Sequence, residues 1–279
     1  MFSRILFPTA LQPEENAAFR TALRLALTEH GAITLLHVGD EDREHVPWER
    51  YPPVRKTLER WGVLAKDSAM SDVYDKLGIE VRKLAFHASD VATSVQEHME
   101  RHRYDLVVMG TEARSSWSRW LRPSKAEPIA EAAHKPALFL PVSGRSPLQG
   151  EKDQLVFKRL LLPVGSLADV TTAVPAALAM AERSTTRPVD ITLLHVGAGT
   201  AVLDQAELPD RDGVVWHREL RDGQVQDRVV ELVQQLDIDL VVMATNGTDS
   251  LKDDLFGTTT ERILRAIERP LLAVPHAAT

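Results

Sequence analysis

The residues best suited to binding chemistry lie near the end of the chain, where Gly247 is followed after nine residues by Gly257 and Thr258. Glycines let main-chain N–H groups approach an anion because no Cβ stands in the way. Thr258-x-x-Glu261 has the spacing of a capping box, which predicts a helix that begins here with the positive end of its dipole toward the loop. These features together predict a cradle for a phosphate or another anion. Capping of the helix by Thr258, with no ligand contact, is the alternative interpretation.

An internal repeat organises the elements that would position this loop. Four apolar blocks of the first half return in the same order in the second half, and a duplication explains this most economically. The blocks pair as Phe2–Pro8 with Phe157–Pro163, Ile33–Gly39 with Ile191–Gly197, Asp105–Thr111 with Asp239–Thr245, and Lys135–Pro141 with Arg269–Pro275. We therefore expect two domains, 1–144 and 155–279, joined by a polar linker over Ser143–Gln154.

Each repeated block is rich in Val, Ile and Leu without polar alternation, which is typical of strands buried on both faces of a parallel sheet. Helical spacing of apolar residues lies between the blocks, in Glu14–His30, with Gly31 expected as its C′ residue, and in Asp90–Arg101. Alternating strands and helices predict right-handed βαβ units, and hence an α/β fold with a doubly wound sheet in each half.

The two halves differ between their second and third strands. The first half has Asp40–Gly78 there, with a helical stretch over Val54–Leu77, whereas the second half has only Ala198–Gly213. A parallel crossover needs about a dozen residues, so the second half has room for at most a short helix. We expect some apolar surface to lie bare on the second domain as a result, and to form a homodimer contact or a ligand groove.

The second half resembles the universal stress protein family, whose motif G-x2-G-x9-G-[ST] matches Ala244-Thr-Asn-Gly247 and, nine residues later, Gly257-Thr258. The resemblance covers nearly the whole chain, twice. It implies two tandem five-stranded parallel sheets, each in strand order 3-2-1-4-5 with flanking helices, and a loop that holds ATP. Because the final strands of such domains resemble a dimer-forming edge, we expect Ala137–Val142 and Leu271–Pro275 to meet, with the domains packed face to face as an intramolecular pseudo-dimer.

The implied function is that of a stress-response regulatory or binding module, with ATP, ADP or AMP held in the second domain only. The residues that the resemblance places against the nucleotide are Gly165, Val196, Ala244, Gly247, Gly257, Thr258 and Thr259. The first half has Gly110, Ala113, Pro123 and Ser124 in the same frame. Pro123 offers no N–H group and Ala113 adds a methyl group, so we expect no nucleotide in the first domain.

Two departures from the family pattern favour an alternative function. Nucleotide-binding members carry an Asp shortly after the first strand, whereas this chain has Thr9-Ala10 and Val164-Gly165 after the two prolines. The loop before Gly257 also carries three Asp residues against one Lys, which opposes a triphosphate. The alternative is a nucleotide-independent scaffold that acts through dimerisation or protein partners.

Composition narrows the classes of partner. Lys and Arg total 33 against 40 Asp and Glu, and the resulting net charge of -7 argues against a nucleic-acid partner. No apolar run reaches the roughly 20 residues that cross a bilayer, so we expect no membrane partner. The chain has no Cys, which excludes disulfides, and it does not begin like a signal peptide. We therefore expect a cytoplasmic protein.

Several histidines invite a metal or catalytic interpretation. His37 and His195 hold equivalent positions near the end of the second strand of each half, where a structural role fits best because no partner has ligand spacing. His98 and His102 are four residues apart, a zinc-compatible spacing, but without a third ligand we expect a solvated helix face. The basic and aromatic segment Arg114–Arg122 is interpreted as a partner or domain contact. We see no catalytic machinery and expect no enzyme, with weak ATP hydrolysis as the open alternative.

Overall fold

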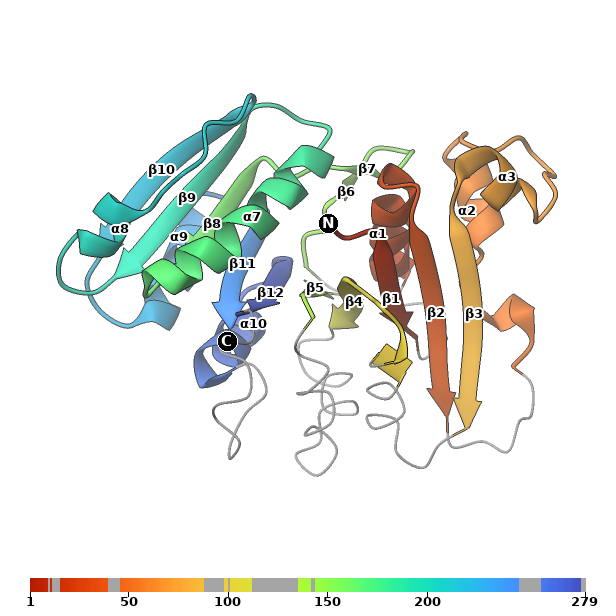
Figure 1. The fold of residues 1–279 in the computed structure, drawn as a ribbon, viewed down its shortest axis with the longest axis horizontal. Coiled ribbons are helices and arrows are strands. Elements are labelled where there is room, and N and C mark those ends of the chain that lie inside the picture. The colour runs from red at the N-terminus through yellow and green to blue at the C-terminus, as the bar shows by residue number, and fades with distance from the viewer. Residues whose placement is uncertain are drawn as a thin grey trace.

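A computed structural model describes residues 1–9, 11, 16–39, 46–87, 98–99, 101–111, 135–141, 144–245 and 257–276. Figure 1 shows an α/β fold in which the two halves of the chain lie side by side. The strands are β1 (Arg4–Pro8), β2 (Ala32–Gly39), β3 (Glu80–His87), β4 (Leu106–Thr111), β5 (Ala137–Pro141), β6 (Leu148–Gln149), β7 (Gln154–Leu155), β8 (Arg159–Pro163), β9 (Val189–Val196), β10 (Val214–Arg221), β11 (Leu240–Thr245) and β12 (Leu271–Pro275). The helices are α1 (Asn16–Thr28), the 3₁₀ helix η2 (Trp48–Arg50), α2 (Val54–Arg60), α3 (Asp72–Leu77), α7 (Leu167–Arg183), α8 (Ala201–Gln205), α9 (Val225–Gln235) and α10 (Gly257–Ala266).

The repeated blocks form the strands of one continuous sheet, in the order β10-β9-β8-β11-β12-β5-β4-β1-β2-β3. Each half therefore has the order 3-2-1-4-5, as the resemblance implied, and the neighbours within each half are parallel. The two halves meet where β12 pairs antiparallel with β5, with Leu271 opposite Phe139 and Ala273 opposite Ala137. The expected meeting of the final strands is confirmed. Packing face to face is wrong, because these two edges satisfy their main-chain N–H and C=O groups by hydrogen bonding to each other.

Helices cover both faces of the sheet and bury its apolar side chains. Successive residues of a strand point to opposite faces, so Ile5 belongs to the buried cluster that includes residues of α1 and α7, while Leu6 belongs to the cluster that includes residues of α9 and α10. Both side chains are fully buried. In Figure 1, α1 and α7 lie in front of the sheet, and α9 and α10 lie behind it.

The end of α1 differs from the expectation by one residue. His30 adopts the left-handed conformation at φ 47°, and it is therefore the C′ residue. The N–H of Gly31 bonds to the carbonyl oxygen of Ala26 and that of His30 to Leu27, which is the Schellman pattern. Gly31 is needed for another reason, because a Cβ on it would lie 2.1 Å from the carbonyl oxygen of Ser3.

The crossovers between the second and third strands also differ from the expectations. The stretch Val54–Leu77 contains two helices, α2 and α3, because Gly62 and Asp67 have positive φ angles that interrupt a helix. In the second half, α8 is short, as expected.

The loop that carries α8 covers its own face of the sheet. Leu203 and Ala206 are buried against β9 and β10, and Trp216 Nε1 donates to the carbonyl oxygen of Pro209 at 3.0 Å. The expectation of a bare apolar surface at this crossover is therefore wrong, because a few loop side chains replace the missing helix. Edge strand β10 still exposes 41% of Val215 and 37% of Leu220.

One aspartate in each half ties the start of the fourth strand to the start of the first. Asp105 accepts hydrogen bonds from the N–H groups of Ser3 and Arg4, at 2.8 and 2.9 Å. Asp239 does the same for Lys158 and Arg159, at 2.7 and 3.0 Å. These bonds satisfy main-chain donors at the start of the first strand. They explain why the repeated block of the fourth strand starts with Asp in both halves.

Candidate functional site

Of the residues assigned to nucleotide binding, those that the structure describes lie toward the carboxyl edge of the second half of the sheet. Because β8, β9 and β11 are parallel neighbours, Gly165 after β8, Val196 at the end of β9 and Ala244 at the end of β11 lie along one edge. The C-terminal end of α10 leads to the opposite edge, where Arg269 Nε donates to the carbonyl oxygen of Ile238 at 3.0 Å. The N-terminus of α10 therefore lies toward the carboxyl edge, where ligands of such folds bind.

Helix α10 begins at Gly257, two residues earlier than Thr259, the first helical residue that a capping box with Thr258 as the N-cap predicts. Thr258 consequently lies inside the first turn and not at the N-cap, a difference within the precision with which a pattern locates helix ends. Thr259 is exposed, and Thr260 is buried. Gly247 lies outside the described residues.

The turn between β8 and α7 is closed by its own carboxylate. Ser166 is the N-cap of α7 and accepts a hydrogen bond from the N–H of Asp169, whose Oδ2 accepts from Ser166 N at 2.9 Å and from Gly165 N at 2.8 Å. The N–H of Gly165 is therefore already paired, so this residue can meet a ligand through its Cα and carbonyl group. Sequence reasoning missed this capping box, although Ser166-x-x-Asp169 has the required spacing.

A chain of three side chains extends from this turn to the end of β12. His276 Nε2 lies 3.0 Å from Asp169 Oδ1, and His276 Nδ1 lies 2.8 Å from Thr172 Oγ1. Because the carboxylate only accepts, Nε2 carries the proton. The N–H of His276 also donates to the carbonyl oxygen of Thr245, at 3.0 Å. These contacts fix the site edge from three elements, α7, β11 and β12.

The histidines of the second strands have the structural role that was expected. His37 Nδ1 lies 2.9 Å from the carbonyl oxygen of Thr9, and His195 Nδ1 lies 2.9 Å from that of Val164. A carbonyl oxygen can only accept, so Nδ1 is the donor in both halves. Each histidine thus holds the residue that follows the first-strand proline.

His98 is not on a solvated face, contrary to the expectation. Its side chain is buried, with Nε2 2.7 Å from Tyr104 Oη and its ring beside those of Phe86 and His102. Burial, and then the charges of His102, Arg101 and Arg82, lower the pKa of His98 to about 4. Tyr104 shields His98 from solvent. The spacing of His98 and His102 alone does not reveal this contact.

Among the described residues, no group of three or more His, Asp or Glu side chains could hold a metal ion. None of the described helices is long and apolar enough to span a membrane. In the first half, Gly110 lies within β4, while Ala113, Pro123 and Ser124 fall outside the described residues, as does Arg114–Arg122.

Comparisons with known proteins agree with this architecture. The Universal stress protein family matches residues 1–141 and 173–275. A universal stress protein from Archaeoglobus fulgidus DSM 4304 has a similar structure, with a TM-score of 0.64 and 14% identity over 99% of this chain and 97% of the other. A functionally unknown protein from Pseudomonas aeruginosa PAO1 has a TM-score of 0.62 at 14% identity, over 99% of this chain and 93% of the other.

At this identity, the two solved structures establish the fold alone. The search of curated proteins gave no match. The family match covers most of the chain in two segments, and the topology repeats once in each half. The chain therefore belongs to the universal stress protein family and is a tandem member of it.

Proposed function

We propose that this chain is a stress-response binding module whose second domain holds one adenine nucleotide, ATP, ADP or AMP. The observation that carries the proposal is the N-terminus of α10 at the carboxyl edge, directly after the glycine loop that contains Gly247 and Gly257. Free N–H groups and the helix dipole at such an end attract phosphate. Val196 and Ala244, both partly exposed at the same edge, would face the apolar base.

The β8–α7 turn shapes how the nucleotide would sit. Asp169 already pairs with the N–H groups of Gly165 and Ser166, so this turn offers no further phosphate donor through them. Phosphate contacts therefore fall to the loop and to the first turn of α10, with Gly257, Thr258 and Thr259. The ligand would pass Gly165 by van der Waals contact only.

Titration with a fluorescent adenine nucleotide tests the proposal, and one site per chain is expected. Gly257→Pro should abolish binding, because proline removes an N–H group yet is well tolerated at the first residue of a helix. Val225→Pro is the matched control, since Val225 is the first residue of α9, is exposed, and follows Gln224 in an extended conformation that suits proline. Binding that survives Gly257→Pro would place the nucleotide elsewhere and would refute the site proposed at the start of α10.

The second candidate is a nucleotide-independent scaffold that acts as a homodimer or through a protein partner. It is favoured by Val164 and Gly165, which stand where nucleotide-binding relatives carry an acidic residue, and by the exposed Val215 and Leu220 on edge strand β10. Mass spectrometry of ligand released from purified, undialysed protein separates the two candidates. An empty protein that light scattering shows to be dimeric, and that Val215→Lys converts to a monomer, would favour the scaffold.

A further inference from the structure

The linker, residues 144–155, does not run directly from the first domain to the second. Its first residues contact the second domain at once: Arg145 N donates to the carbonyl oxygen of Glu268, at 3.1 Å. The main chain at Gly144 lies so close that a Cβ there would be 2.6 Å from the same oxygen. Only glycine permits this approach.

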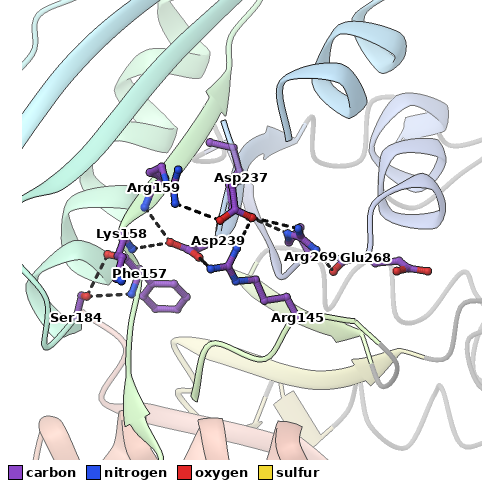
Figure 2. A network of polar contacts seen from close by, with 10 residues as sticks. Arg145, Phe157, Lys158, Arg159, Ser184, Asp237, Asp239, Glu268 and Arg269 are labelled. Atoms are coloured by element: carbon purple, nitrogen blue, oxygen red, sulfur yellow. Dashed lines mark hydrogen bonds and ion pairs between the residues drawn. The ribbon is translucent and has the colours of Figure 1, made fainter. Parts of the chain in front are cut away.

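The Arg145 side chain fastens this end of the linker to the second domain. Its Nη1 lies 2.5 Å from Asp237 Oδ1 and its Nη2 lies 3.1 Å from Asp239 Oδ1 (Figure 2). The Asp239 side chain is only 3% exposed, so its pairing with Arg145 is poorly screened by water. Arg269 contacts the same oxygen of Asp237, Oδ1, at 3.4 Å, and Arg159 contacts the other oxygen, Oδ2, at 3.1 Å.

The linker then turns back to the first domain. Strands β6 and β7 form a small antiparallel hairpin between the two halves (Figure 1). At its tip, the buried Asp153 carboxylate lies 2.6 Å from Arg60 Nη2, 2.8 Å from Trp61 Nε1 and 3.0 Å from Arg20 Nε. Arg24 Nε donates to the main-chain oxygen of Asp153, at 3.1 Å. These four partners all belong to α1, or to α2 and its C-cap.

After Asp153 the chain crosses to the second domain again. Thr185 N donates to the carbonyl oxygen of Leu155 at 2.8 Å, and Phe157 N donates to Ser184 Oγ at 2.9 Å. The linker thus contacts the second, the first and again the second domain. Arg145 of the linker pairs with Asp237 and Asp239 of the second domain. Asp153 of the linker pairs with Arg20 and Arg60 of the first domain.

The strand pairing between the two domains is short, with Leu271–Ala273 of β12 opposite Ala137–Phe139 of β5, and an ion pair of Arg183 in α7 with Glu29 adds to it at 2.7 Å. So few ladder hydrogen bonds give little protection against separation of two edges. We propose that the linker holds the β5–β12 pairing closed through Arg145 and Asp153, and is not a flexible tether.

Hydrogen exchange of the full chain tests this with Arg145→Met, with Asp153→Asn and with both together. Asn tolerates the left-handed conformation of Asp153, at φ 49°, so this change removes charge without backbone strain. The double variant should exchange the β5 and β12 amides at least about tenfold faster, with β8 and β9 unchanged. Arg82→Gln, which removes an exposed ion pair with Glu80 far from the linker, is the control and should change neither.

A distance measurement supplies a second readout. Spin labels are attached to two introduced cysteines, Met70→Cys and Asp222→Cys, which are exposed and in different domains. Because the natural chain has no Cys, no other residue takes the label. The distance distribution should broaden in the double variant. Unchanged exchange and unchanged distances would overturn the proposal. An equal acceleration in all strands would also overturn it, because the two anchors would then stabilise the fold in general and not the domain junction.

Discussion

His276 donates a hydrogen bond from Nε2 to Oδ1 of Asp169, 3.0 Å away, and so connects the end of β12 to the start of α7. The other oxygen of the same carboxylate caps the helix through Gly165 and Ser166. One side chain therefore sets both the helix start and one wall of the proposed site.

Replacing Asp169 by Asn should destabilise the chain, because a charge-assisted cap and the histidine contact are both weakened. We expect a loss of about 1–2 kcal/mol in the free energy of unfolding, measured by urea denaturation. Asp227→Asn is the matched control, because Asp227 occupies the same helical position in α9 but its N-cap Gln224 makes no side-chain cap bond. Asp227→Asn should cost less than about 1 kcal/mol, through the helix dipole alone. Equal losses in the two variants would contradict the capping role.

His98 should make stability fall as the pH is lowered. Its pKa in the folded chain is about 4, below the ordinary 6.5, so the unfolded chain binds the additional proton between these values. The stabilisation is complete above about pH 6.5 and is lost as the pH falls toward 4, by at most about 3 kcal/mol.

Thermal or urea unfolding from pH 7 to pH 4 measures this loss. His98→Gln keeps a hydrogen-bonding group near Tyr104 but does not titrate, so the variant should show a shallower dependence on pH. His217→Gln, on exposed strand β10, controls for the loss of one histidine and should retain the steep dependence. A parent and a His98→Gln variant with identical pH profiles would show that His98 is not responsible.

The paired aspartates of the fourth strands provide a third prediction. Asp239→Asn should cost about 3 kcal/mol, because it is 3% exposed and also pairs with Arg145. Asp105→Asn likewise removes the carboxylate charge and one of the two acceptor oxygens that Ser3 and Arg4 use, but Asp105 is only half-buried, so about 1–2 kcal/mol is expected. Urea denaturation of both variants gives the comparison. A larger loss in the free energy of unfolding for Asp105→Asn than for Asp239→Asn would contradict the greater role of the buried aspartate.

Much of the sheet could be predicted from the sequence. Strands buried on both faces are marked by apolar runs such as Leu160–Leu162, and the repeat transfers each assignment to the other half. The strand order came from the family resemblance. The antiparallel meeting of β5 and β12 could be expected as a contact, but its geometry depends on which groups the two edges leave unpaired.

The site was less accessible to sequence reasoning. A glycine such as Gly165 signals close approach, but nothing in its type shows that Asp169 already occupies its N–H. The linker likewise reads as polar and turn-forming, although Asp153 is buried by arginines distant in the sequence. Such long-range charge pairing leaves no local periodicity. Spacing reveals helix faces and caps, whereas partners across the fold require the tertiary structure.

Gly31 lies where the main chain leaves no room for a side chain. Gly31→Ala would place a methyl group 2.1 Å from the carbonyl oxygen of Ser3. The same oxygen accepts a hydrogen bond from the N–H of Ala32, where the pairing of β1 and β2 begins. Relief requires β1 to move away from β2, so we expect a loss of at least about 3 kcal/mol in unfolding free energy. Gly150→Ala is the control, because Gly150 has a positive φ but no atom within 4 Å of the added Cβ, so only backbone strain of about 1 kcal/mol applies. Thermal denaturation separates the two contributions, and a Gly31→Ala variant as stable as Gly150→Ala would show that the strand can shift at little cost.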